Sequence, residues 1–160
     1  MSFIKYNPNP TGKETGDCVV RAISIAEGTT WDQAFQRLTE KAFREKDMPS
    51  INPVWTNYLI EQGYTLHGIP NTCPRCYTVE DFAYDHPYGT YVLGTGTHAI
   101  AVIDGNYIDT WDSGDVIPMY YLKKGEKDGS NDTIPAGNTT NRTTTAVPAN
   151  PSTANPAATV

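Results

Sequence analysis

Three residues spread along the chain have the chemistry of a nucleophile, a base and an orienting acid. Cys18 opens a mostly apolar stretch that ends at Gly28, whereas His98 and Asp109 lie in two consecutive strand-like runs. A cysteine is activated when a base takes its proton and an acid fixes the tautomer of that base. The sequence therefore predicts that Cys18, His98 and Asp109 form a catalytic triad. Asp112 is the substitute for Asp109 as orienter.

The nucleophile is expected on the first turn of a buried helix. Asp17 is a good N-cap, the residues after Cys18 are apolar except for Arg21 and Ser24, and Gly28 ends the run. Unpaired backbone N–H groups and the helix dipole lower the pKa of a thiol there, whereas the Asp17 carboxylate raises it. An imidazolium partner is therefore needed. The alternative is that Cys18 is a small buried apolar residue.

The register of a hairpin decides which acid faces His98. Asp104-Gly105 separates two strand-like runs and predicts a two-residue turn. His98 then lies opposite Trp111, and Asp109 is its diagonal neighbour on the same face, within reach of the imidazole. One extra loop residue would instead place Asp112 directly across from His98.

The chain resembles the papain-like cysteine peptidases, including their bacterial relatives of the C39 type. The resemblance rests on three motifs in the order of that family: Gly16-Asp17-Cys18, Thr97-His98-Ala99-Ile100-Ala101-Val102 and Asp109-Thr110-Trp111. It implies a helical half packed on a sheet, with Trp111 shielding the hydrogen bond of Asp109. The overall pattern also looks like small papain-fold proteins encoded by bacteriophages.

One feature of the family is missing. The family places a glutamine a few residues before the nucleophile as a donor of the oxyanion hole, but the first glutamine here is Gln33. Loss of such a donor costs roughly 10²–10³ in rate. The side chains that precede the nucleophile and can substitute for it are Asn7, Asn9, Lys13 and Thr15.

The expected activity is that of a cysteine-dependent peptidase or amidase that works through an acyl-enzyme and needs no cofactor. The substrate would be a peptide, an isopeptide or a cell-wall amide. Two alternatives remain open at this point. One is an acyl transferase of the transglutaminase type, which uses the same triad, and the other is a non-catalytic binding or structural phage protein that keeps the fold.

Cys73 and Cys76 are spaced like a metal knuckle or a redox pair. A structural zinc site needs four ligands, and the sequence has no second cysteine pair. His67 and His86 do not have knuckle spacing. We therefore expect free loop thiols and no metal site, with partial metal or redox use and a structural disulfide as the alternatives.

Composition restricts the partners and the location. The chain has 160 residues and a formal net charge of −6, which argues against a nucleic-acid backbone as its main partner. No apolar run is long enough for a bilayer, and no signal-peptide pattern is visible. We expect a cytoplasmic protein, or one of the host-cell cytoplasm if a phage encodes it.

The predicted fold class is α+β, with helices first and an antiparallel sheet second. Residues 1–124 form the predicted papain-like domain, in which the Cys18 helix packs on the sheet. Residues 125–160 contain no aromatic side chain and are rich in Thr, Asn, Pro and Ala, which predicts a disordered tail. The predicted elements are helices at 18–27, 31–45, 53–62 and 79–85 and strands at 64–66, 90–93, 98–103, 106–111 and 116–122.

Overall fold

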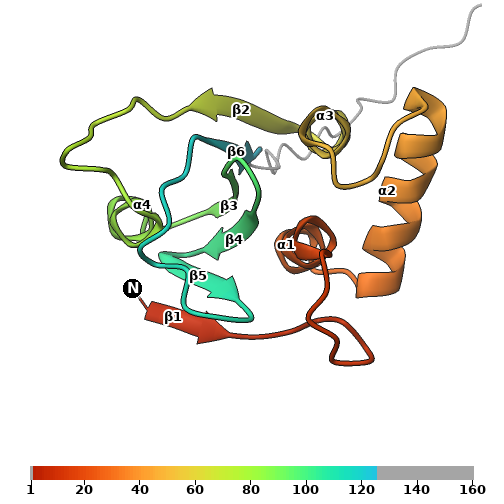
Figure 1. Cartoon of the computed structure of the whole chain (residues 1–160), viewed down its shortest axis with the longest axis horizontal. Helices are drawn as coiled ribbons and strands as arrows, with labels where there is room; N and C mark the ends of the chain where they lie inside the picture. The colour runs from red at the N-terminus through yellow and green to blue at the C-terminus, as the bar shows by residue number, and fades with distance from the viewer. Residues whose placement is uncertain (1, 126–160) are drawn as a thin grey trace, which may run out of the picture. The chain divides into compact units, whose positions relative to one another are not determined.

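The helix that begins at Cys18 lies between the sheet and a second helix (Figure 1). The structure, a computed structural model, describes residues 2–125. Helix α1 (Cys18–Glu27) ends at Gly28, which adopts φ 65° in the left-handed region where glycine is favoured. The predicted central helix is thus confirmed. Apart from Gly125, the predicted tail of residues 125–160 lies outside the described residues.

The remaining helices also begin at their predicted signals. Thr30 and Gln33 form a reciprocal capping box, each side chain accepting the backbone N–H of the other residue at 3.2 Å. Such a box satisfies two N–H groups that have no partner within the helix. The three helices are α2 (Trp31–Glu45) after this box, α3 (Asn52–Glu61) with Pro53 in its first turn, and α4 (Val79–Asp85) after a second box at Thr78.

A six-stranded sheet in the order β1-β5-β4-β3-β6-β2 carries the rest of the fold. Every neighbouring pair is antiparallel except β1 and β5, which are parallel. The strands are β1 (Ser2–Lys5), β2 (Tyr64–Gly68), β3 (Thr90–Gly94), β4 (Ala99–Ile103), β5 (Asn106–Asp109) and β6 (Tyr120–Lys124).

The prediction of α+β is confirmed, but that of a wholly antiparallel sheet from the C-terminal half was wrong. Strand β1 comes from the N-terminal lead-in and pairs in parallel with β5, so that Lys5 lies beside Asp109. Lys5 and Ile4 are exposed, so the strand has no buried alternation to reveal it in the sequence. The parallel pairing is also between residues more than a hundred positions apart, which no local pattern predicts.

The β4–β5 hairpin has the predicted two-residue turn. Asp104 and Gly105 adopt φ 46° and 74°, the left-handed conformations of a type I′ turn. The register pairs Ile103 with Asn106 and Ala101 with Ile108. Continued toward the open end, this register places Trp111 opposite His98, as predicted from the two-residue loop.

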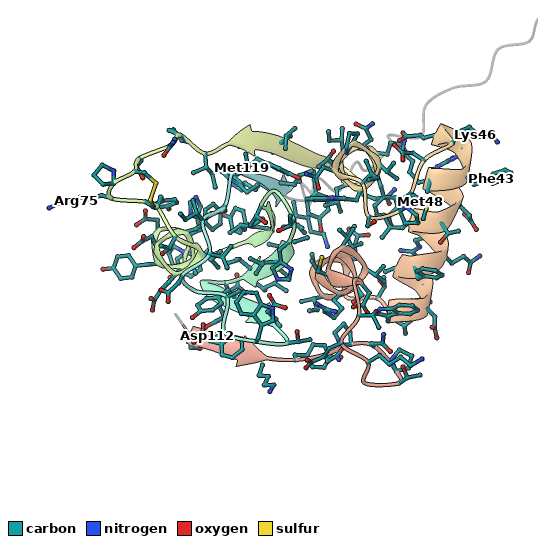
Figure 2. The ribbon with its side chains drawn as sticks, viewed as in Figure 1. Phe43, Lys46, Met48, Arg75, Asp112 and Met119 are labelled. Carbon is teal, nitrogen blue, oxygen red and sulfur yellow. A yellow bond between two sulfur atoms is a disulfide. The ribbon has the colours of Figure 1, made fainter. Side chains whose placement is uncertain are left out.

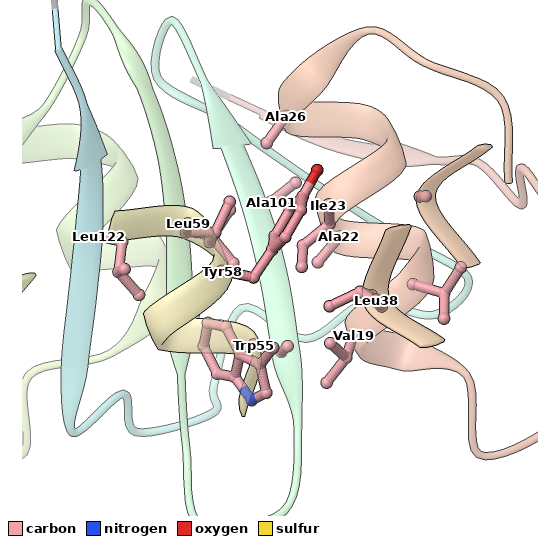
Figure 3. Packing of buried hydrophobic residues seen from close by; sticks show 14 of the residues in the cluster. Val19, Ala22, Ile23, Ala26, Leu38, Trp55, Tyr58, Leu59, Ala101 and Leu122 are labelled. Atoms are coloured by element: carbon pink, nitrogen blue, oxygen red, sulfur yellow. The ribbon is translucent and has the colours of Figure 1, made fainter. Parts of the chain in front are cut away.

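Two apolar cores lie on opposite faces of the sheet. On one face α1, α2 and α3 pack around residues such as Ile23, Leu38 and Trp55, together with Ala101 and Leu122 of the sheet (Figure 3). On the other face α4 covers a second cluster that includes Phe82 and Tyr91. Within residues 2–125, no helix has both the length and the apolar character that crossing a bilayer requires.

Candidate active site

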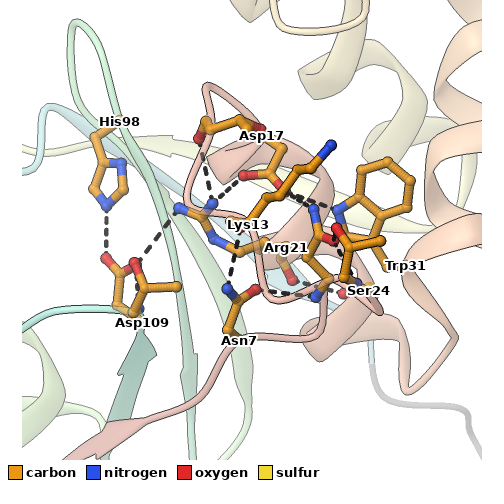
Figure 4. A network of polar contacts seen from close by, with 12 residues as sticks. Asn7, Lys13, Asp17, Arg21, Ser24, Trp31, His98 and Asp109 are labelled. Carbon is orange, nitrogen blue, oxygen red and sulfur yellow. Dashed lines mark hydrogen bonds and ion pairs between the residues drawn. The ribbon is translucent and has the colours of Figure 1, made fainter.

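The hairpin brings His98 and Asp109 into direct contact (Figure 4). Nε2 of His98 lies 2.6 Å from Oδ2 of Asp109. The other carboxylate oxygen of Asp109 accepts the backbone N–H of Thr110 at 2.7 Å, and the side chain is buried. These contacts hold the carboxylate still and fix the ring. Because Nε2 faces the acid, Nδ1 is the ring nitrogen left for the thiol.

A hydrogen bond between Cys18 and His98 is among the causes that shift the pKa of both groups, so the three predicted triad residues come together. Burial by itself raises the pKa of the Cys18 thiol. The hydrogen bond with His98, a backbone hydrogen bond from Ala99 and the positive charges of His98 and Arg21 more than offset it, and the pKa falls below its ordinary value. Arg21 of α1 and the residues His98 and Ala99 at the start of β4 therefore all favour the thiolate.

The pKa of the His98 imidazole is shifted in the opposite direction. Burial lowers the pKa of His98, but the hydrogen bonds to Asp109 and Cys18, and the negative charges of these two groups, raise it to about 9. A lowered thiol pKa beside a raised imidazole pKa favours the thiolate–imidazolium ion pair near neutral pH. In such a pair the sulfur carries a negative charge and the imidazolium holds a proton next to it.

Trp111 lies against the base. The centroids of the Trp111 and His98 rings are 5.5 Å apart, with 32° between their planes. About half of Trp111 is exposed, whereas the Asp109 side chain is almost fully buried. The indole thus packs beside the imidazole.

Arg21 is a site residue that sequence reasoning missed. Its guanidinium forms an ion pair with Asp17 one helical turn earlier and lies 4.0 Å from Oδ1 of Asp109. All three side chains are at least nine-tenths buried. Arg21 therefore places a positive charge between the carboxylate next to the nucleophile and the carboxylate that orients the base. The signal in the sequence was the spacing of Asp17 and Arg21, which is that of an i, i+4 ion pair.

The prediction that Asp17 caps α1 with its side chain was wrong. Its carboxylate makes no capping hydrogen bond. One oxygen is paired with Arg21, and the other accepts the side-chain N–H groups of Asn9 at 3.0 Å and Trp31 at 2.9 Å. These partners occupy both oxygens of the carboxylate. The backbone N–H groups of the first turn are therefore left without a capping side chain.

The four candidate oxyanion donors lie in the lead-in before α1. The amide of Asn7 donates to the backbone carbonyl of Lys13 at 3.2 Å, and that of Asn9 donates to Asp17. Thr15 contributes its carbonyl, which accepts from the guanidinium of Arg21 at 3.5 Å. These groups thus build the loop that holds Asp17. The first-turn N–H groups of α1 are the donors next to Cys18 that have no intrahelical partner.

Asp112 is occupied elsewhere. Its Oδ1 accepts the hydroxyl of Tyr107 at 2.8 Å and the backbone N–H of Gly114 at 3.2 Å. Figure 2 shows it in the loop after β5. Of the two acids that the sequence offered as orienter, the structure brings Asp109 to His98.

Cys73 and Cys76 form a disulfide, so the prediction of free loop thiols was wrong for this pair. The bond lies in the loop between β2 and α4, where Arg75 points outward (Figure 2). Cys18 is the one free cysteine. Among the described residues, no group of three or more His, Cys, Asp and Glu side chains could hold a metal ion.

Comparison with known proteins found no match to a family model, a curated protein or a solved structure. The functional assignment therefore depends on the geometry of this site and on the motifs that led to it.

Proposed function

We propose that the protein is a cysteine-dependent hydrolase of the peptidase or amidase class, with a papain-like arrangement of its triad. The observation that carries this proposal is that His98 lies between Cys18 and Asp109 and interacts with both. In this arrangement the pKa of the Cys18 thiol is lowered and the pKa of the His98 imidazole is raised. A merely structural cysteine needs neither shift.

The arrangement supports a two-step acyl transfer. The thiolate of Cys18 attacks the carbonyl carbon of an amide, and the carbonyl oxygen takes the negative charge beside the first-turn N–H groups of α1. The C–N bond then breaks as the His98 imidazolium gives its proton to the leaving amine. Water, deprotonated by His98, attacks the thioester, and the carboxylic acid leaves as the thiol forms again.

Alkylation with iodoacetamide followed by peptide mapping tests the proposal. We expect one label per native chain, at Cys18, with a rate that remains high well below the ordinary pKa of a cysteine, roughly 8.5. The Cys73–Cys76 disulfide keeps the other two sulfurs out of the reaction while no reductant is present.

His98→Ala is the matched control, because it removes the base and leaves the thiol. The variant should react appreciably only as the pH approaches the ordinary pKa of a cysteine thiol. If wild type and His98→Ala have the same pH dependence, the site is not an activated nucleophile, and the protein is a binding or structural protein.

A further inference from the structure

A pocket of about 310 Å³ lies at the start of α1, on the side facing α2. We call it the Trp31 pocket. Residues 15–17, which lead directly into the nucleophile, form one wall, and Val19 and Val20 form the adjoining one. The opposite walls come from α2 and from the segment before α3, through Trp31, Phe35 and Pro49.

The walls of this pocket are mainly apolar and are held in place. The rings of Trp31 and Phe35 stack with centroids 4.9 Å apart and only 10° between their planes. The indole N–H of Trp31 donates to Asp17 at 2.9 Å, which fixes the ring against the helix start. Phe35 is 44% exposed although it lies on a helix that buries other apolar residues. An exposed aromatic face at the rim of a pocket is typical of a binding site.

The pocket offers no free charge to a ligand. Asp17 is the one charged residue in its lining. Its carboxylate is paired with Arg21 and also accepts hydrogen bonds from Asn9 and Trp31. Because the charge is neutralised and its oxygens are occupied, the pocket favours an apolar group over a cationic one.

The chemistry of the triad determines what would reach this pocket. In the tetrahedral intermediate, the acyl carbon carries the sulfur, the oxyanion, the leaving amine and the acyl chain. The amine must lie toward His98, which protonates it. The acyl chain then extends away from His98. Contacts link His98 through Asp109, Arg21 and Asp17 to Trp31, which lies at the far end of this network (Figure 4).

From this geometry we infer that the Trp31 pocket binds the apolar side chain next to the acyl carbon of the substrate. The inference rests on the proposed function, because it assumes an acyl group on Cys18. It specifies the substrate class further: an amide or peptide whose acyl side carries an aliphatic or aromatic group.

Paired electrophiles test this assignment. The chloromethyl ketones of N-acetylphenylalanine and N-acetylglycine both form a C–S bond to Cys18 and release chloride, but only the first carries an apolar side chain. Their second-order rate constants are measured with the protein and with glutathione, which corrects for intrinsic reactivity. We expect the protein to favour the phenylalanyl probe by about tenfold after this correction, since filling an apolar pocket discriminates on that scale.

Phe35→Ala should reduce this preference several-fold, and the pH dependence of iodoacetamide alkylation reports separately on the state of Cys18 in the variant. Phe43→Ala is the matched control, because Phe43 lies on the same helix, is 73% exposed and does not line the Trp31 pocket. A cooperative thermal unfolding transition, as in the wild type, shows that each variant is folded. Should Phe35→Ala fail that check, Phe35→Leu replaces it, with a smaller loss expected.

The possible failures are distinguishable. Equal corrected rates for the two probes, or equal losses in Phe35→Ala and Phe43→Ala, would overturn the pocket assignment while normal iodoacetamide kinetics upheld the proposed function. An ordinary pKa for alkylation of Cys18 would overturn the proposed function, and the pocket assignment with it.

Discussion

An acidic residue directly before a cysteine makes the thiolate harder to form, and the residues around Asp17 remove this obstacle. Arg21 neutralises the carboxylate, while Asn9 and Trp31 donate hydrogen bonds to its other oxygen. The same guanidinium also lies beside Asp109. One buried arginine thus neutralises the carboxylate next to Cys18 and also lies beside the carboxylate that contacts His98.

The pH dependence of the reaction with iodoacetamide should follow the two shifted groups. Because the thiol pKa is lowered, the thiolate is lost only as the pH falls through that lowered value. Because the imidazole pKa is raised to about 9, its proton stays until the pH rises through about 9. We therefore expect a plateau at neutral pH and a second change in rate near pH 9.

Substitution of Asp109 should shift the pH below which the reaction of Cys18 with iodoacetamide slows. Asp109→Asn removes the charge that stabilises the imidazolium and keeps a hydrogen-bonding side chain, so the apparent pKa of Cys18 should rise in part. Asp109→Ala should raise it further. Asp112→Asn is the control, because Asp112 bonds Tyr107 and Gly114 instead. A larger effect of Asp112→Asn than of Asp109→Asn would contradict the assignment.

Arg21→Met should affect both stability and reactivity. It leaves Asp17 without the positive charge of its ion pair and Asp109 without a nearby guanidinium, and removing one partner of a buried ion pair costs about 3–5 kcal/mol. It should also raise the apparent pKa of Cys18, because the charge of Arg21 lowers it. Urea unfolding and the pH dependence of iodoacetamide alkylation measure the two effects.

The double variant Arg21→Met, Asp17→Asn separates charge from packing. It removes the orphaned carboxylate, so much of the lost stability should return. If the double variant is no more stable than Arg21→Met alone, Arg21 acts through its hydrocarbon contacts and not through its charge.

The contact between His98 and Asp109 was predictable from the sequence because it depends on residue types and on one turn. Asp104-Gly105 determined the hairpin length, and the hairpin length determined which acid faces His98. The role of Arg21 was not predictable, because burial of a charge depends on what covers it. The prediction that Asp17 caps α1 failed for a related reason. An aspartate at a helix start can bond either the helix N–H groups or another side chain, and only the fold selects one of these partners.

Among the elements, β3 is fitted closely to its neighbour β6. Gly94 pairs with Tyr120, and a Cβ on Gly94 would lie 2.2 Å from the phenol ring. The ring in turn stacks on the buried Trp55, with centroids 5.8 Å apart. Gly94 also pairs with Ala99, whose backbone forms a hydrogen bond with Cys18. The absence of a side chain at Gly94 therefore positions an aromatic ring beside the site.

Gly94→Ala should destabilise the fold by about 1–3 kcal/mol, because a methyl group there overpacks the Tyr120 ring. Gly96→Ala is the matched control, since a Cβ at Gly96 meets nothing within 4 Å. Thermal unfolding of the two variants measures the difference. Equal melting temperatures would mean that the Tyr120 ring moves aside freely.

Local signals also explain which elements were predictable. Caps at Thr30 and Thr78 and the proline at Pro53 mark helix starts that can be read from the local sequence, because they satisfy or replace backbone donors. Strand β1 has no such signal. It is an exposed edge strand, and its pairing with β5 exists only once the rest of the sheet is folded.

Within residues 2–125, the candidate site lies where helix α1 meets the sheet. The proposed nucleophile, Cys18, begins a helix of one core. The proposed base, His98, directly precedes β4, and the proposed acid, Asp109, ends β5 of the sheet that separates the two cores. The sheet is thus the element on which the geometry of the site depends. The α+β class was predictable because helix and strand periodicities follow one another along the chain, whereas the disulfide was not, because cysteine spacing alone does not determine pairing.

The sequence predicts that the segment after Gly125 adds nothing to this unit. That segment contains no aromatic side chain and has few large apolar ones, so it offers little surface for docking. A chain that ends at Gly125 should melt within about 2 °C of the full chain, since a change in stability well below 1 kcal/mol shifts the midpoint little. It should also keep the same pH dependence of iodoacetamide alkylation at Cys18. A drop of many degrees would show that the segment packs on the domain, and a changed pH profile alone would show that it acts on the site.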